Sequence, residues 1–268
     1  MARAAGNDSH YTFVLKNVVT GKYDNSCTIR LPSVTTIIGE VLAKPMLVGW
    51  AYRFTRDAVA GTLNVLTEAG VPPEEILDTF MDGDALELYL KENQLRPEDF
   101  KAEAADRGTV AHNLLERLAT AYVEADEVAA ERIAQRIIEN PESSGWNRAV
   151  AGWWLDRSPR VVESETKLMS LAHQYIGTVD LIWTDWDGNL TLTDLKSRKA
   201  GATPYDSDHI QCGAYVEAYE ETSGRVVDRT TVLVVREDGS WVEEETHLDA
   251  RGIFLDLLSA YKKLKVRK

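Results

Sequence analysis

The chain has 268 residues, 44% of them hydrophobic, and its 43 acidic and 30 basic side chains give a formal net charge of −13. Seven Trp, ten Tyr and five Phe residues can supply a sizeable core, which excludes a disordered chain and indicates a globular protein. The acidity disfavours a protein that coats nucleic acid or anionic membrane by charge alone, because such binding depends on phosphates neutralised by Lys and Arg.

The acidic excess is concentrated in one part of the chain. Residues 61–142 contain 19 acidic and 7 basic side chains, so the remaining positions are nearly balanced. A local basic groove elsewhere in the chain is therefore compatible with the overall charge.

Cysteine usage and hydropathy indicate where the protein resides. Cys27 and Cys212 are too few for a disulfide framework, a zinc ribbon or a four-thiolate iron–sulfur cluster. Residues 1–8 lack the apolar region of a signal peptide, and no window approaches 18 uncharged apolar residues. We therefore expect a cytoplasmic protein that does not associate with a membrane and carries no iron–sulfur cluster.

Two local patterns open the chain. Residues 11–30 alternate between apolar and polar positions around a break that contains a glycine, which predicts a β-hairpin. Ser33 then suits the N-cap of a helix through Val41, and Pro45 interrupts the chain before a second helix.

The acidic part of the chain has a helical pattern throughout residues 72–141, with apolar positions three and four residues apart. Its last long helix is predicted to begin near Thr109, because residues 106–108 (Asp-Arg-Gly) offer a turn. On this helix His112 and Glu116 are one turn apart and share a face.

Short β-rich runs alternate with helices after residue 145. The string Asp-Trp-Asp-Gly-Asn at residues 185–189 has the composition of a hairpin turn. The order of elements predicts an α/β fold with a mixed central sheet flanked by helices. The predicted elements are a Trp-rich helix from about residue 146, strands at 161–167, 174–184 and 190–196, a helix at 207–221, strands at 229–235 and 241–246, and a C-terminal helix from Leu248.

Two aspartates of the predicted hairpin can project to the same side. Asp180 lies on the first strand beside Ile176 and Ile182, and Asp194 lies on the second beside Leu190 and Leu192, so both faces are largely apolar. Two carboxylates on adjacent strands, beside the carbonyl of Leu195, form an oxygen site suited to Mg²⁺ or Mn²⁺. Lys196 points the same way, where it can orient or deprotonate a water and neutralise charge that develops on a phosphate.

Two less specific interpretations of this cluster stay open. Asp180 and Asp194 can be solvated hairpin positions, or they can form a buried ion triad with Lys196 that has only a structural role. An Asp-Asp-Lys cluster on an apolar face is costly to bury without a ligand or a paired partner, which favours the functional interpretation.

The residues around this cluster resemble a known family. Gly-Thr-Val-Asp ending at Asp180, followed by Asp-Leu-Lys ending at Lys196, resembles the core motif of the PD-(D/E)XK nuclease superfamily, and of its RecB-like exonuclease branch in particular. The run Arg107–Glu116 (RGTVAHNLLE) resembles the upstream G-T-x-x-H-x-x-x-E helix of that branch, whose His is a metal ligand, here His112. The run at residues 32–38 (PSVTTII) is similar to bacteriophage members.

Two further motifs match the same branch in order and spacing. Glu165, with Glu163 as a close alternative, resembles its acidic strand. The string from Gln211 to Tyr215 (QCGAY) resembles its Q-x-x-x-Y helix, in which both side chains help to hold DNA or to position the lysine. Members with an iron–sulfur cluster carry four cysteines and this chain has two, so the resemblance to those members stops at the nuclease fold.

Basic and hydroxyl side chains beside the motifs are candidate DNA contacts. Arg198 and Lys199, with the hydroxyl of Ser197, follow the motif lysine directly and look like a phosphate clamp, with a solvated loop as the alternative interpretation. We expect Arg107, at the start of the upstream motif, to contact DNA as well. Glu116 can orient His112 or a metal-bound water, or it can be an exposed helix residue.

The resemblance implies a restriction-endonuclease-like PD-(D/E)XK core in residues 106–268, with residues 1–105 forming an N-terminal hairpin and helical region that packs on it. It implies a metal-dependent deoxyribonuclease, with Mg²⁺ or Mn²⁺ as cofactor. The implied metal ligands are Asp180, Asp194, the Leu195 carbonyl and His112, and the implied catalytic residues are Lys196, Asp194, Asp180, Glu165 and Gln211.

The expected activity is that of a phage-encoded exonuclease in the host cytoplasm, acting at ends of single- or double-stranded DNA in recombination, repair or degradation. A structure-selective endonuclease of the same fold and a non-catalytic DNA-binding protein are the alternatives. Strand polarity, the number of metal ions, self-association into a homo-oligomer and a phage recombination partner are left open by the sequence.

Overall fold

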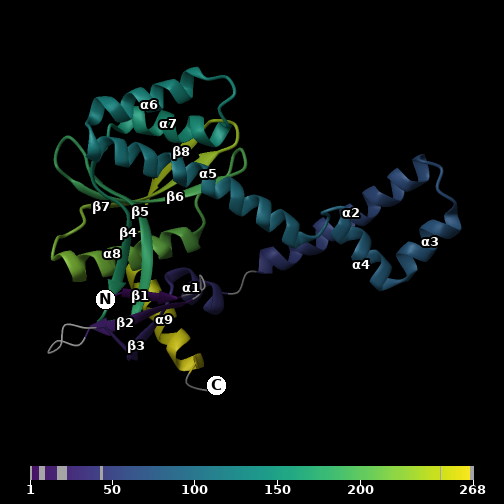
Figure 1. The fold of residues 1–268 in the computed structure, drawn as a ribbon, viewed down its shortest axis with the longest axis horizontal. Helices are drawn as coiled ribbons and strands as arrows, with labels where there is room; N and C mark the ends of the chain where they lie inside the picture. The colour runs from purple at the N-terminus through teal and green to yellow at the C-terminus, as the bar shows by residue number, and fades with distance from the viewer. Residues whose placement is uncertain (1, 6–9, 17–22, 43–44, 248, 266–268) are drawn as a thin grey trace. The chain divides into compact units, whose positions relative to one another are not determined.

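A five-stranded mixed sheet forms the centre of the larger of two structural units (Figure 1). The computed structural model describes residues 2–5, 10–16, 23–42, 45–247 and 249–265. The chain divides into one unit of Met1–Leu42 with Val110–Lys268 and a second unit of Ala43–Thr109.

The central sheet has the strand order β4-β5-β6-β7-β8. Only β6 and β7 pair in parallel, and the other neighbours are antiparallel, so the predicted α/β class with a mixed sheet is confirmed. The predicted hairpin between β5 and β6 is also present, and Gly188 in its turn has a φ of 86°, a backbone region that favours glycine. The strands are β4 (Arg160–Ser170), β5 (Tyr175–Thr184), β6 (Leu190–Arg198), β7 (Arg229–Arg236) and β8 (Trp241–Glu245).

Helices cover both faces of this sheet, because its central strands are apolar on both sides. One core contains Trp153 and Trp154 with Leu181 and Leu195, and the other contains Ile182 and Leu192. The first core is formed with α5 (Pro97–Glu124), α6 (Glu127–Glu139) and α7 (Gly145–Arg157), and the second with α1 (Val34–Val41), α8 (Asp206–Ser223) and α9 (Ala250–Lys265).

A second, three-stranded sheet of β1 (Ala2–Ala5), β2 (His10–Lys16) and β3 (Tyr23–Pro32) includes the predicted N-terminal hairpin. The predicted glycine turn at residues 20–22 lies outside the described residues. The predicted cap is confirmed, since the Ser33 hydroxyl accepts a hydrogen bond from the Thr36 N–H at 3.1 Å at the start of α1.

The long helix α5 corrects one prediction. It begins at Pro97 and continues through residues 106–108, where the sequence predicted a turn before a helix start near Thr109. Proline suits the first turn of a helix, and a single glycine inside a long helix costs only about 1 kcal/mol, so Gly108 does not end it. The domain boundary proposed between residues 105 and 106 therefore lies within α5.

The second unit is helical, as predicted from its three- and four-residue periodicity. It consists of α2 (Pro45–Glu68), α3 (Pro73–Met81), α4 (Gly83–Glu92) and the first part of α5. Among the described residues, no helix has the length and apolar character needed to cross a bilayer.

Candidate metal centre

The centre lies where strands β5 and β6 separate. Their pairing ends at Leu181 opposite Thr193, so Asp180 and Asp194 are the first residues beyond the paired segment. The Leu195 N–H, which has no partner on β5, instead donates to Asp180 Oδ2 at 2.5 Å. Both aspartates are buried, with exposed fractions of 7% and 2%, so they are not solvated hairpin positions.

Three elements bring a histidine and two carboxylates together. His112 on α5, Glu165 on β4 and Asp180 on β5 each offer a ligand atom, and these atoms all lie within 4.8 Å of one another. The Nδ1 atom of His112 is 3.0 Å from Asp180 Oδ1. The register of β4 and β5 places Glu165 opposite Asp180, so Glu165 rather than Glu163 joins the group.

The electrostatics of this group fit a divalent cation. Burial raises the pKa of Glu165 to about 7, and the negative charges of Asp180 and Glu116 add to the shift. Burial lowers the pKa of His112, but the hydrogen bond with Asp180 and the charges of Asp180 and Asp194 outweigh it and raise the pKa overall. Clustered carboxylates repel one another unless a positive charge lies among them, so an imidazole and two carboxylates at this spacing suit a bound divalent ion.

Glu165 also has an unusual backbone, with a φ of 48° in the left-handed region. A residue other than glycine adopts this region at a cost of about 1 kcal/mol or more, and the surrounding sheet must hold it there. Because β4 pairs with β5 on both sides of this position, the sheet fixes the Glu165 side chain close to Asp180.

A lysine and an aspartate form the second part of the centre. The Nζ atom of Lys196 lies 2.5 Å from Asp194 Oδ2, and both groups sit at the carboxyl-terminal part of β6. Burial would lower the pKa of Lys196, but Asp194 and Asp180 outweigh it and raise the pKa above its ordinary value. Burial raises the pKa of Asp194 to about 6, against the opposing effect of Lys196. The ammonium group is thus held beside the carboxylates.

Helix α8 contributes a hydrogen bond to the Asp194 carboxylate that pairs with Lys196. The Gln211 Nε2 donates to Asp194 Oδ1 at 3.3 Å and to the Tyr215 hydroxyl at 2.6 Å. The phenol of Tyr215 is buried, and burial raises its pKa well above the ordinary value. The structure therefore brings Gln211 and Tyr215 into one hydrogen-bonded chain that ends on Asp194.

Gly177 on β5 permits the close approach of this helix. A methyl group at this position would overlap the Cε1 atom of Tyr215 and would lie 3.1 Å from Val34 Cγ2. We expect Gly177→Ala to lower the free energy of unfolding by about 1–3 kcal/mol, the usual cost of overpacking a well-packed core, measured by urea denaturation. The matched control is Gly252→Ala in α9, where the added methyl group meets nothing within 4 Å. Equal stability of the two variants would refute this role for Gly177.

Two of the predicted DNA contacts, Ser197 and Arg198, are not members of the metal group. The Arg198 guanidinium pairs with Asp208 at 3.0 Å and stacks over the Tyr205 ring at 4.6 Å. Ser197 is half-buried on β6, next to Lys196 in sequence. The side chain of Arg107 lies outside the described residues.

Asp208, the partner of Arg198, is a buried charged residue that was not predicted from the sequence. Asp208 is buried at the start of α8, where its carboxylate accepts from the Tyr205 N–H at 2.9 Å as well as from Arg198. An acidic residue three positions after a helix cap was the available signal, because such a residue satisfies the first free N–H group of the helix.

Comparison with known proteins gives one family match and several distant folds. A family model described as the PD-(D/E)XK nuclease superfamily matches residues 85–250. The solved structure of SSO0001 has a TM-score of 0.30 and 13% identity, with 59% of this chain and 87% of that chain covered. A candidate exonuclease from Eubacterium rectale has a TM-score of 0.36 and 10% identity, with 59% of this chain and 66% of that chain covered. No curated protein matches. The matched range 85–250 contains every residue of the centre described above.

Proposed function

Because the chain belongs to the PD-(D/E)XK nuclease superfamily, we propose that it is a DNA exonuclease that hydrolyses phosphodiester bonds with Mg²⁺ or Mn²⁺. The observation that carries the proposal is the convergence of His112, Glu165 and Asp180, with Lys196 held next to them by Asp194. This set of groups combines a cation site with a fixed positive charge, and both can stabilise the charge that develops during metal-assisted phosphodiester hydrolysis.

In this proposal His112, Glu165 and Asp180 hold the metal, and Asp194 and the Leu195 carbonyl complete its ligand set. A divalent ion held there would polarise a phosphate oxygen and lower the pKa of a bound water. The buried carboxylates orient the site, since Asp180 is anchored by the Leu195 N–H and Asp194 by Gln211. Their anchoring reduces the reorganisation that the reaction would otherwise require.

Lys196 has the role of the charged group that orients the attacking water and neutralises charge on the scissile phosphate. Its ammonium is held by Asp194, and both residues lie on β6, the second strand of the hairpin. Gln211 and Tyr215 act through Asp194, because their hydrogen-bonded chain ends on that carboxylate. Both are therefore positioning residues for the lysine.

The proposal also covers the biological process in which the enzyme acts. The resemblance to bacteriophage exonucleases supports a phage-encoded enzyme that acts on DNA ends in recombination, repair or degradation. Arg107, Ser197 and Arg198 are its proposed DNA contacts. Of these, Arg198 must exchange or share its pairing with Asp208 to reach a phosphate.

Digestion of linear and covalently closed circular DNA tests the proposed function. With Mn²⁺ or Mg²⁺, we expect end-labelled linear single-stranded or duplex DNA to release short labelled products while the closed circle persists. Rapid nicking of the circle would instead support a structure-selective endonuclease. If linear and circular DNA both remain intact while DNA is bound, the non-catalytic alternative is correct.

A further inference from the structure

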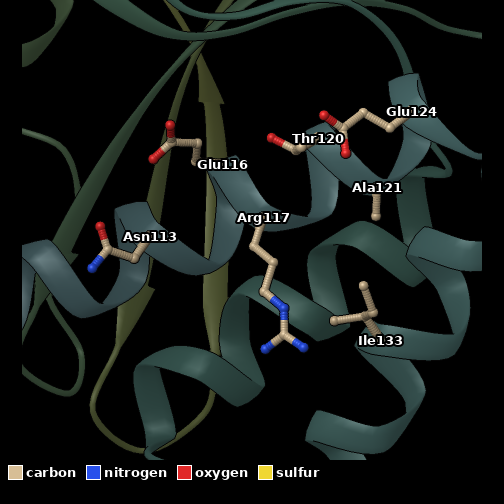
Figure 2. A pocket seen from close by; sticks show the side chains of 7 residues that line it. All are labelled: Asn113, Glu116, Arg117, Thr120, Ala121, Glu124 and Ile133. Atoms are coloured by element: carbon tan, nitrogen blue, oxygen red, sulfur yellow. The ribbon is translucent and has the colours of Figure 1, made fainter.

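A pocket of about 390 Å³ lies between α5 and α6 (Figure 2). Six of its lining side chains lie on consecutive turns of α5, and one comes from α6. This volume is within the range of sites that bind small molecules. The lining residues are Asn113, Glu116, Arg117, Thr120, Ala121, Glu124 and Ile133.

Helix α5 carries both the pocket and one residue of the metal group, His112. Asn113 directly follows His112, and Glu116 lies one helical turn after it. Glu116 lines the pocket and shares a helix face with His112, and its charge adds to the raised pKa of Glu165, so it lies on the side of the pocket that is nearer to the metal group. A DNA strand bound at the metal group could therefore place a neighbouring nucleotide at this pocket.

The chemistry of the lining favours a nucleobase over a phosphate. Glu116 and Glu124 outnumber the one cation, Arg117, so the pocket is net negative and disfavours a second phosphate. Carboxylates instead accept hydrogen bonds from the amino groups of bases. Ala121 and Ile133 supply an apolar surface for a ring.

Arg117 is available to a ligand. In Figure 2 its guanidinium extends away from α5 and from the Glu116 carboxylate, and the ion pairs among the described residues do not include it. A planar guanidinium can stack on an unpaired base, and the amide of Asn113 and the hydroxyl of Thr120 can each bond to a base edge.

We propose that the pocket between α5 and α6 binds one unpaired nucleoside of the DNA strand that is cut. This inference rests on the proposed function, because it takes the strand at the metal group to be DNA. A base can enter only when it is outside the duplex stack, so the pocket selects single strands or frayed ends over intact duplex.

A set of single strands with one abasic nucleotide at successive positions from the end tests the proposal. Binding is measured by fluorescence anisotropy with Mn²⁺ in the Lys196→Ala background, so that cleavage does not consume the probe. We expect one abasic position to weaken binding by about tenfold, because a base contact of this kind contributes about that factor. Intact duplex should bind more weakly than the single strand.

Substitutions of residues that line the pocket test whether the loss of affinity at the abasic position arises there. Arg117→Gln and Ala121→Leu should each weaken binding of the intact strand. In each variant the abasic nucleotide should then cause little further loss of affinity, because the protein substitution and the missing base remove the same contact. Arg132→Gln is the matched control, since Arg132 is an exposed cation on α6 that does not line the pocket. It should preserve the full abasic effect.

The outcomes separate this inference from the proposed function. If no abasic position weakens binding, or if the loss is unchanged in Arg117→Gln and Ala121→Leu, the pocket does not bind a base, even if the wild-type protein cuts DNA. If the abasic effect depends on the pocket but the wild-type protein leaves DNA uncut, the inference stands and the exonuclease proposal fails.

Discussion

Lys196→Ala is expected to reduce cleavage of linear DNA by at least about a hundredfold, the usual loss when one preorganised charge is removed from a reacting centre. The physical reason is that the variant removes the cation that Asp194 holds at 2.5 Å, next to the metal group. The loss should appear in kcat more than in KM, because the charge acts on the reacting phosphate. End-labelled linear DNA digested with Mn²⁺ provides the measurement.

Two controls accompany this substitution. Lys91→Ala removes the same charge from an exposed position on α4, which carries none of the residues of the centre, and should leave the rate close to wild type. Lys196→Gln retains a donor for the buried Asp194 carboxylate, so it tests whether lost activity reflects lost folding. A wild-type cleavage rate in Lys196→Ala would overturn the assignment of the centre.

Manganese ions are expected to raise the melting temperature of the protein by about 5–10 °C at a concentration a hundredfold above the dissociation constant. The gain arises because the ion binds the folded arrangement of His112, Glu165 and Asp180, which come from three separate elements and do not meet in the unfolded chain. EDTA should reverse the shift. Differential scanning fluorimetry with and without Mn²⁺ measures it.

Asp180→Asn should abolish the shift, because it removes the carboxylate that both His112 and the Leu195 N–H contact. Asp187→Asn is the matched control, since this carboxylate lies exposed in the β5–β6 turn. A full manganese shift in Asp180→Asn would mean that the ion binds elsewhere on the protein.

Much of the fold could be predicted because local patterns determine it. Alternation along residues 174–184 and 190–196, with an Asp-Gly turn between them, is sufficient for the hairpin that carries Asp180 and Asp194. The same local information failed at the start of α5. There the polar string at residues 106–108 has the composition of a turn, but the helix runs through it.

The arrangement within the centre depends on tertiary structure. No local pattern reveals that the pairing of β5 and β6 ends at the Leu181–Thr193 pair. Because it ends there, the Leu195 N–H is free to donate to the Asp180 carboxylate. The choice between Glu163 and Glu165 likewise required the register of β4 against β5. The pocket needs a residue of α6, Ile133, beside six from α5, so periodicity along one helix could not predict it.

The most direct test of the proposed metal centre is anomalous scattering from crystals of the wild-type protein soaked in Mn²⁺. We expect a strong anomalous peak within coordination distance of His112, Glu165 and Asp180, and its loss in crystals of Asp180→Asn. An ordered centre without a peak, or a peak bound only by other residues, would contradict the assignment of this group as the metal site.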